Sequence, residues 1–206
     1  MKRLLLLFGL LGFQGALWSQ RASVCEFTPE PVVVDGVLSE AVWRNAPTLG
    51  YKTDGRGAFI WQGDESIDRF IQQYPYDTSR SETQTRFAMA FDEKFLYAVF
   101  ICENRHPEKP YVIQSLKRDF SVTNTDAVVL TLSPFNDGQN GFSFGVTPFN
   151  SQREGSVENG GGFGVTTAWD QVWYSATRRY GDYWVAEVAI PFNSLRFNPQ
   201  QKMWRF

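Results

Sequence analysis

The sequence contains a single histidine, His106, and only two cysteines among its 206 residues. This scarcity excludes metal centres built from clusters of histidine and cysteine. Two isolated cysteines also do not form the disulfide framework of a small secreted domain. Cys25 and Cys102 are therefore compatible either with one disulfide or, for Cys102, with a buried thiol in an apolar strand pattern. His106 lies in the segment NRHP without an evident nucleophile partner, which favours a surface loop over a catalytic base.

An excess of basic charge is also missing. The formal net charge is −2, so the chain has no basic footprint for nucleic acid. Gly160-Gly161-Gly162 follows no strand-to-helix pattern, which argues against a phosphate-binding loop and favours a flexible one. No motif fixes two carboxylates across a cleft, as glycoside hydrolysis requires. The sequence therefore shows no catalytic constellation within these residues.

The N-terminus has the composition of an export signal. Lys2 and Arg3 precede an apolar run over 4–17, and Ser19 is a small residue at a plausible cleavage point. We interpret residues 1–20 as a signal peptide, 21–31 as a linker and 32–206 as one domain. We accordingly expect export to the periplasm, the outer membrane or the extracellular space.

Alternating apolar residues predict strands joined in hairpins over most of the chain after residue 80. The predicted pairs are 86–91 with 95–102, 126–133 with 141–147, and 172–178 with 183–190. Regularly spaced hairpins with few helical patterns indicate an all-β fold, an antiparallel β-sandwich with long irregular loops. Two regions, 53–81 and 151–168, show no clear pattern; the first holds Trp61 and a weak helical patch over 64–73, and the second is interpreted as a mobile loop.

The segment VVVDGVLSEAVW (32–43) predicts a strand, a tight turn at Asp35-Gly36 and one short helical turn. Ser39 is the expected cap of this helix, and Glu40 is expected in its first turn. The apolar residues that fall on one side of the turn, and are expected in the core, are Leu38, Val42 and Trp43. At the other end, Trp204-Arg205-Phe206 stops in an apolar run, from which we expect the sequence to be the N-terminal piece of a longer protein whose sandwich continues past it.

Several ordered motifs resemble those of family 9 carbohydrate-binding modules. VVVDGVLSEAVW resembles the family's opening D-G-x-L-x-E-x-x-W, TRFAMAFDEKFLYAVFICEN its next hairpin, and DYWVAEVAIPFNSLRF its closing segment. The R-D…D stretch (Arg118, Asp119, Asp126) and WDQVW (Trp169–Trp173) extend the match over most of residues 32–206. The resemblance implies a β-sandwich that binds a polysaccharide or oligosaccharide. It also implies a secreted or outer-membrane protein of Gram-negative bacteria whose downstream domain, often labelled a hydrolase, links it to carbohydrate catabolism and O-glycosyl hydrolysis.

One departure from the family pattern concerns its sugar clamp. In sugar-binding members an aromatic residue stands just before the Asp that starts the middle strand, whereas here Thr123-Asn124-Thr125 precede Asp126. The second aromatic of the clamp would lie past residue 206. The sequence therefore shows neither half of it.

Six residues remain as candidates for carbohydrate binding: Trp169, Asp170, Trp173, Arg118, Asp119 and Asp126. An exposed Trp face suits the C–H faces of a pyranose, and a carboxylate accepts from hydroxyl groups. Trp173 alternates with Val172 and Tyr174 in a predicted strand, so a core position is its alternative role. Arg118 with Asp119 either grips a ligand or forms an internal pair that pins the loop.

The resemblance is also compatible with structural calcium, because relatives carry it. The oxygen-bearing candidates are Asp35, Glu40, Asp119, Asp126 and Glu187, but their spacing defines no calcium loop. The main functional hypothesis is thus non-catalytic glycan binding. The alternative is a structural module that has lost the sugar site and docks onto the downstream domain of its own chain.

Overall fold

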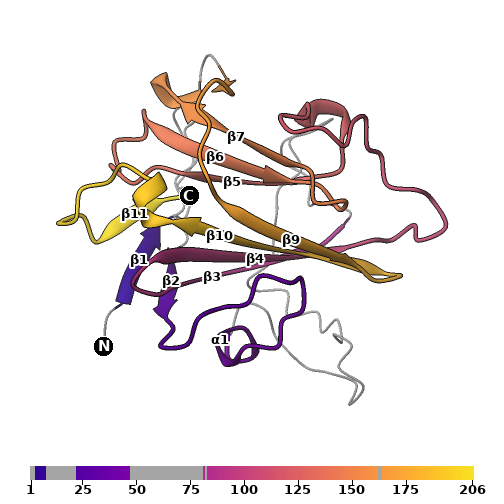
Figure 1. Cartoon of the computed structure of the whole chain (residues 1–206), viewed down its shortest axis with the longest axis horizontal. Helices are drawn as coiled ribbons and strands as arrows, with labels where there is room; N and C mark the ends of the chain where they lie inside the picture. Colours follow the sequence, from indigo (N-terminus) through magenta and orange to yellow (C-terminus); the bar gives the residue numbers. More distant parts are fainter. Residues whose placement is uncertain (1–2, 8–21, 47–80, 82, 162–163) are drawn as a thin grey trace.

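Two β-sheets packed face to face form the body of the protein, as predicted (Figure 1). The computed structural model describes residues 3–7, 22–46, 81, 83–161 and 164–206, so Trp61 and the patch 64–73 lie outside the described residues. In spatial order the larger sheet contains β11 (Met203–Arg205), β1 (Arg3–Leu7), β2 (Ala22–Phe27), β3 (Thr85–Phe91), β4 (Phe95–Glu103), β10 (Tyr183–Pro191) and β9 (Tyr174–Arg179). The smaller sheet contains β5 (Val128–Leu132), β6 (Gly141–Val146), β7 (Gln152–Val157) and β8 (Val165–Thr166).

The helices of the described residues are short. They are α1 (Ala41–Arg44) and the 3-10 turns η2 (Val122–Asn124), η3 (Asn159–Gly161) and η4 (Phe192–Ser194). Neighbouring strands are antiparallel except in two pairs, β1 with β11 and β2 with β3. The three predicted hairpins, β3–β4, β5–β6 and β9–β10, are all present. β4 is buried along both faces because it lies between β3 and β10 and both sides of the larger sheet are covered.

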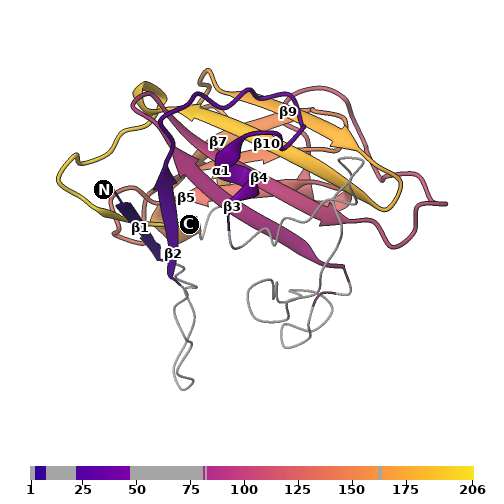
Figure 2. The same cartoon turned by 90° about the horizontal axis from the view of Figure 1, so that it is seen from below.

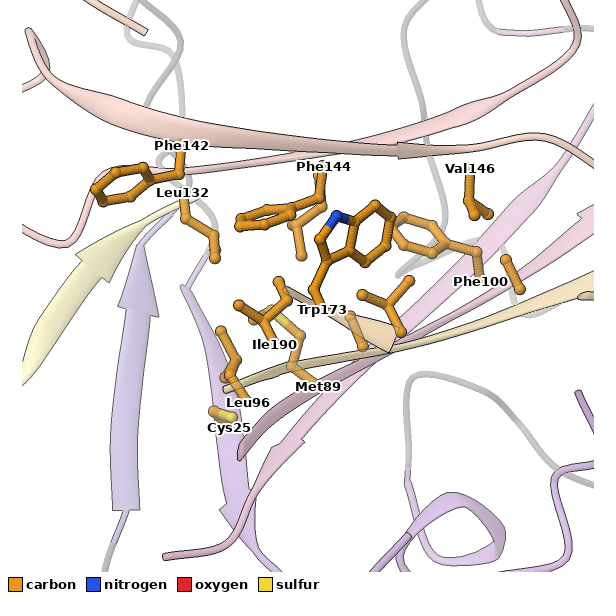
Figure 3. Packing of buried hydrophobic residues seen from close by; sticks show 14 of the residues in the cluster. Cys25, Met89, Leu96, Phe100, Leu132, Phe142, Phe144, Val146, Trp173 and Ile190 are labelled. Carbon is orange, nitrogen blue, oxygen red and sulfur yellow. The ribbon is translucent and has the colours of Figure 1, made fainter. Parts of the chain in front are cut away.

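The main core fills the space between the sheets (Figure 3). The smaller sheet contributes Leu132, Phe142, Phe144 and Val146 to this core. The larger sheet contributes Leu96, Met89, Phe100 and Ile190, and the indole of Trp173 packs with them. These side chains alternate along their strands, so the period-two pattern of the sequence identifies the inward faces correctly.

A second apolar cluster lies on the opposite face of the larger sheet. The segment 32–46 with α1 crosses this face (Figure 2) and buries Val32, Leu38 and Trp43 against it. Tyr97, Val99 and Val185 supply the sheet side of the cluster. The larger sheet is therefore the middle layer of three.

A buried carboxylate anchors this outer layer. Glu187 is 1% exposed and accepts hydrogen bonds from the backbone N–H groups of Gly36 (2.8 Å) and Asp35 (3.1 Å). Its other oxygen accepts from Nε1–H of Trp43 at 3.0 Å. Gly36 has a φ of +79°, and an added Cβ would lie 3.0 Å from that of Arg178, so the turn requires glycine. Burial raises the pKa of Glu187 to about 7, and the nearby carboxylates of Glu40 and Asp35 act in the same direction.

Two local predictions in the opening segment are wrong. Residues 32–34 belong to no strand; Val32 packs on the sheet face instead of pairing with a strand. The cap of α1 is Glu40 rather than Ser39, and it makes no side-chain capping bond. Glu40 instead accepts a hydrogen bond from the backbone of Val33 at 3.3 Å. The Asp35 carboxylate does bond its own turn, accepting from the N–H of Val37 at 2.8 Å.

The interpretation of 151–168 as a loop is also wrong, since β7 and β8 lie within it. Both cysteines are buried free thiols, so the disulfide alternative for Cys25 and Cys102 does not apply. Arg3–Leu7, inside the expected signal peptide, forms β1 between β2 and β11. In the described part of the chain, no helix has the length and apolar character needed to cross a membrane.

The environment of Glu187 predicts that stability falls as the pH rises. Its folded pKa of about 7 lies above the ordinary 4.5, so the protonated form stabilises the fold fully below 4.5, and this contribution is lost as the pH rises through 7. The loss amounts to about 3 kcal/mol. Thermal unfolding of the wild type and of Glu187→Gln between pH 4.5 and 8 measures it: the variant is expected to unfold at lower temperature at pH 4.5 and to show a flatter pH dependence.

The exposed Glu93 provides the matched control. Glu93→Gln should retain the pH dependence of the wild type, because Glu93 is exposed and makes no part of the environment of Glu187. Parallel curves for Glu187→Gln and the wild type would contradict the assignment.

Candidate functional site

Polar side chains occupy the inward face of β7, where apolar ones would be expected. In the β6–β7 pair, Glu154 lies opposite Phe144 and Gln152 lies opposite Val146, so these four side chains share one face. Phe144 and Val146 belong to the core between the sheets. Across that space the larger sheet ends at β9, its edge strand. The polar residues of β7 therefore lie at the side of the sandwich where β9 is the edge strand, and Gln152 bonds Ser175 of that strand.

Glu154 is the buried centre of this region, with 2% of its surface exposed. Its Oε2 accepts from Nε1–H of Trp173 at 3.1 Å, and its Oε1 accepts from Nη2 of Arg118. Burial raises the pKa of Glu154, and a hydrogen bond with the Asp170 carboxyl adds to the rise, while the Trp173 N–H and the Arg118 charge oppose it. The carboxyl is thus held by one neutral donor from the core and one cation from the surface.

The side chain of Arg118 reaches from the buried carboxyl group of Glu154 to the solvent. Its Nη2 also donates to Oδ1 of Asp170 at 3.3 Å, so one nitrogen bridges two carboxyl groups. The Arg118 side chain is 51% exposed and that of Asp170 is 80% exposed. A guanidinium has five N–H donors. Because its contacts with the described residues all use Nη2, the group keeps donors for a ligand.

Two tryptophans border this group. Trp169 is half-buried and lies on Phe142, with ring centroids 4.7 Å apart and planes tilted by 32°. Trp173 is buried and meets the edge of Phe144 at 5.3 Å. Trp173 thus occupies the core, as its alternative role predicted, and it also donates to Glu154. We refer to Arg118, Glu154, Asp170 and Trp173 as the Glu154 cluster.

The remaining two candidates, Asp119 and Asp126, have positions in the loop that precedes β5. Asp119 has a φ of +61° and donates its backbone N–H to the carbonyl of Gln152 at 2.9 Å. This bond sets the Arg118 side chain beside β7. Asp126 accepts from the N–H of Val112 through its carboxylate and donates its own N–H to the Val112 carbonyl, both at 2.8 Å. Asp126 therefore closes the loop and takes no part in the Glu154 cluster.

Glu154 is the member of the cluster that sequence reasoning missed. It lies 36 residues from Arg118 along the chain, in a stretch without hydrophobic periodicity. Residues 152–156 are all polar or glycine, so the sequence offers no alternation from which this strand could be recognised.

The carboxylates proposed for calcium do not form a site. Both oxygens of Glu187 are occupied by N–H donors, and Asp126 is bonded to Val112. Calcium takes six to eight oxygen ligands. Within the described ranges, no group of three or more His, Cys, Asp or Glu side chains is placed to hold a metal ion. His106 is exposed and lies 3.1 Å from Glu108, in agreement with the predicted surface loop.

The geometry of the cluster predicts strong coupling between Arg118 and Glu154. Arg118→Met leaves the buried carboxyl without its cation, which should lower the free energy of unfolding by about 1–2 kcal/mol, discounted for the exposure of the arginine. In a Glu154→Gln background the same change should cost less. A double-mutant cycle by chemical denaturation at pH 8 measures the difference. Additive effects of the two substitutions would contradict the arrangement.

Comparison with family models and with curated proteins gives no match. Among solved structures, the chain is similar to a carbohydrate binding module family 9 (CBM9) from Caldicellulosiruptor kristjanssonii in complex with glucose. The TM-score is 0.49 and the identity 15%, over 85% of this chain and 69% of that one. A CBM9 structure from the same organism in complex with cellotriose is similar over 81% of this chain and 66% of that one, with a TM-score of 0.48 and 14% identity.

Proposed function

We propose that the protein is a non-catalytic carbohydrate-binding module whose ligand contacts Arg118, Asp170 and Trp169. The observation that carries this proposal is the half-exposed guanidinium of Arg118, held in place by the buried Glu154. A fixed guanidinium beside an exposed carboxylate offers both donors and an acceptor to sugar hydroxyls. Because Glu154 holds the arginine before the ligand arrives, binding would lose little side-chain entropy.

Trp169 supplies the apolar part of the proposed contact. Its ring rests on Phe142 and Phe144, with centroid separations of 4.7 and 5.8 Å, so its orientation is set by the core. The ring is half-buried, and its chain neighbour Asp170 is highly exposed. An aromatic ring next to convergent polar groups is the usual composition of a small-ligand site.

A second candidate function is docking onto a downstream domain of the same protein. It is favoured by three exposed apolar residues, Val112, Leu116 and Val122, on the segment between β4 and β5. Exposed apolar side chains in one segment suit contact with another protein surface. If this candidate is correct, substituting Asp170 or Trp169 has no effect on saccharide binding.

The wider setting of the protein is also proposed. We infer export through residues 1–20, whose cleavage would also remove β1 from the larger sheet. Action at the cell envelope in carbohydrate catabolism would follow, with any O-glycosyl hydrolase activity on a downstream domain. The support is the basic start and apolar run of the sequence together with the resemblance of its motifs. Expression of the full chain in a Gram-negative host should release a protein beginning near Gln20. An N-terminus at Met1 in the exported fraction would contradict cleavage.

The binding proposal predicts that Asp170→Ala weakens saccharide binding by about tenfold, since one good polar contact contributes roughly 1.4 kcal/mol. Thermal stability should change little, because Asp170 is exposed. Trp169→Ala should reduce binding further, although part of its effect passes through the core contacts with the two phenylalanines. A glycan array identifies a ligand, and calorimetry then measures each dissociation constant.

Asp182→Ala is the matched control, because Asp182 is an exposed aspartate in the β9–β10 turn. It should bind as the wild type does. The proposal fails if no saccharide on the array binds, and the docking candidate then gains. It fails equally if a ligand binds but Asp170→Ala and Trp169→Ala leave its affinity unchanged.

A further inference from the structure

A small polar cavity of about 180 Å³ lies where the smaller sheet meets β11. Ser133, just past β5, and Arg205 of β11 exchange two backbone hydrogen bonds of 2.8 and 3.2 Å, which join the two sheets at this point (Figure 1). The side chains and glycines that form the polar lining are Thr131, Ser133, Gly138, Gln139, Gly160 and Arg205. We call this space the Arg205 cavity. It is smaller than typical small-molecule sites of roughly 300–1,000 Å³, so it suits a single chemical group.

The guanidinium of Arg205 is held in place by the β5–β6 turn. Its Nε donates to Oδ1 of Asn136 at 2.8 Å. Gly138 has a φ of +66°, and a Cβ added there would lie 2.8 Å from Nη1 of Arg205, so glycine is needed for this close approach. The turn itself is closed by the carboxylate of Asp137, which accepts from the backbone N–H of Gln139 at 2.8 Å. The arginine head is therefore positioned before any ligand arrives.

The charge of Arg205 is not neutralised by a neighbour in the described part of the chain. No carboxylate there lies at ion-pair distance from it, and its side chain bonds only the neutral amide of Asn136. Arg118, by contrast, bridges the carboxyl groups of Glu154 and Asp170. An added anion is therefore opposed by two carboxyl groups at Arg118, whereas at Arg205 it meets an open positive charge.

The lining of the Arg205 cavity matches the hydrogen-bonding needs of an oxyanion. With Nε bonded to Asn136, the donors on Nη1 and Nη2 of Arg205 remain for a ligand. A guanidinium offers parallel N–H groups that fit two oxygens of a carboxylate, sulfate or phosphate. The hydroxyl of Thr131 and the side-chain amide of Gln139 are exposed at the same cavity and add neutral donors.

We infer that the Arg205 cavity binds one oxyanion group, a carboxylate, sulfate or phosphate, through paired N–H donors of Arg205. The group is either a free ion or part of an acidic sugar. This inference goes beyond the proposed function and does not depend on it, because the cavity shares no residue with the Glu154 cluster. A bound anion would contact both β11 and the β5–β6 turn, and would thereby strengthen the junction between the two sheets.

The test titrates the full chain with sodium sulfate, sodium phosphate and sodium acetate, with sodium chloride added to keep the ionic strength constant. NMR spectra follow the Nε–H resonance of Arg205 and the backbone N–H resonances of Gly138 and Gly160. With at least one of the three anions these should shift in a saturable way, with a dissociation constant of about 1–10 mM, as expected of one partly exposed bidentate contact. The Nε–H resonance of Arg118 should not follow the same curve.

Substitutions then assign the effect to the guanidinium. Arg205→Gln should weaken anion binding at least about tenfold, and Arg205→Lys, which keeps the charge and loses the paired donors, should weaken it less. Gly138→Ala should also weaken it, because the added Cβ displaces the guanidinium. Arg196→Gln is the matched control, since it removes the same charge from an exposed arginine elsewhere, and it should bind as the wild type does. Thermal unfolding without added anion checks that each variant is folded.

Galacturonate and glucose 6-sulfate distinguish the two sources of the group. Tighter binding of either than of acetate or sulfate, lost in Arg205→Gln, identifies an acidic sugar, and equal affinities identify a free ion. Shifts that rise linearly without saturation for all of these anions overturn the inference, as does equal binding by the wild type and a folded Arg205→Gln. A glycan array without any ligand contradicts the proposed function and leaves anion binding at Arg205 intact, so the two failures are distinguishable.

Discussion

Burying the carboxyl group of Glu154 is the constraint that shapes the lateral side of the sandwich. A carboxyl removed from water is costly unless hydrogen bonds and an opposite charge replace its hydration. The larger sheet ends at β9 and offers no strand to supply those partners. They come instead from the side chains of Trp173 and Arg118. The need to satisfy one interior group thus places an arginine at the surface, in a fixed position.

A second buried carboxyl group lies on the other face of the larger sheet. Glu187 is buried there, and an indole N–H, that of Trp43, again donates to it. The other donors to Glu187 are backbone N–H groups of the turn at Asp35-Gly36, which are neutral. Burial raises the pKa of this carboxyl to about 7, and the group serves to attach a layer. Glu154 instead has a cationic partner, the half-exposed Arg118, so this arrangement places a charged group at the surface.

The sequence predicted the parts of the fold whose periodicity reflects one buried face. The hairpin of β3 and β4 is such a part, because its apolar residues alternate and its turn is short. β7 was missed since its inward residues, Gln152 and Glu154, are polar and their partners lie far away in the chain. The cap of α1 was displaced by one residue because Glu40 is engaged with Val33. For β7 it was tertiary contacts that outweighed the local pattern.

In the candidate site too, the sequence identified some residues and not others. Arg118, Asp170 and the two tryptophans were recognisable from their residue types, but nothing in the sequence indicated that Glu154 would join them. Asp126 has an equally suggestive type and instead closes a loop through Val112. Residue type therefore selects candidates, and the register of β6 against β7 decides between them, because it sets Glu154 beside the core. A site that depends on strand register in this way would lose its arrangement if β7 shifted by one residue, since every side chain would then change faces.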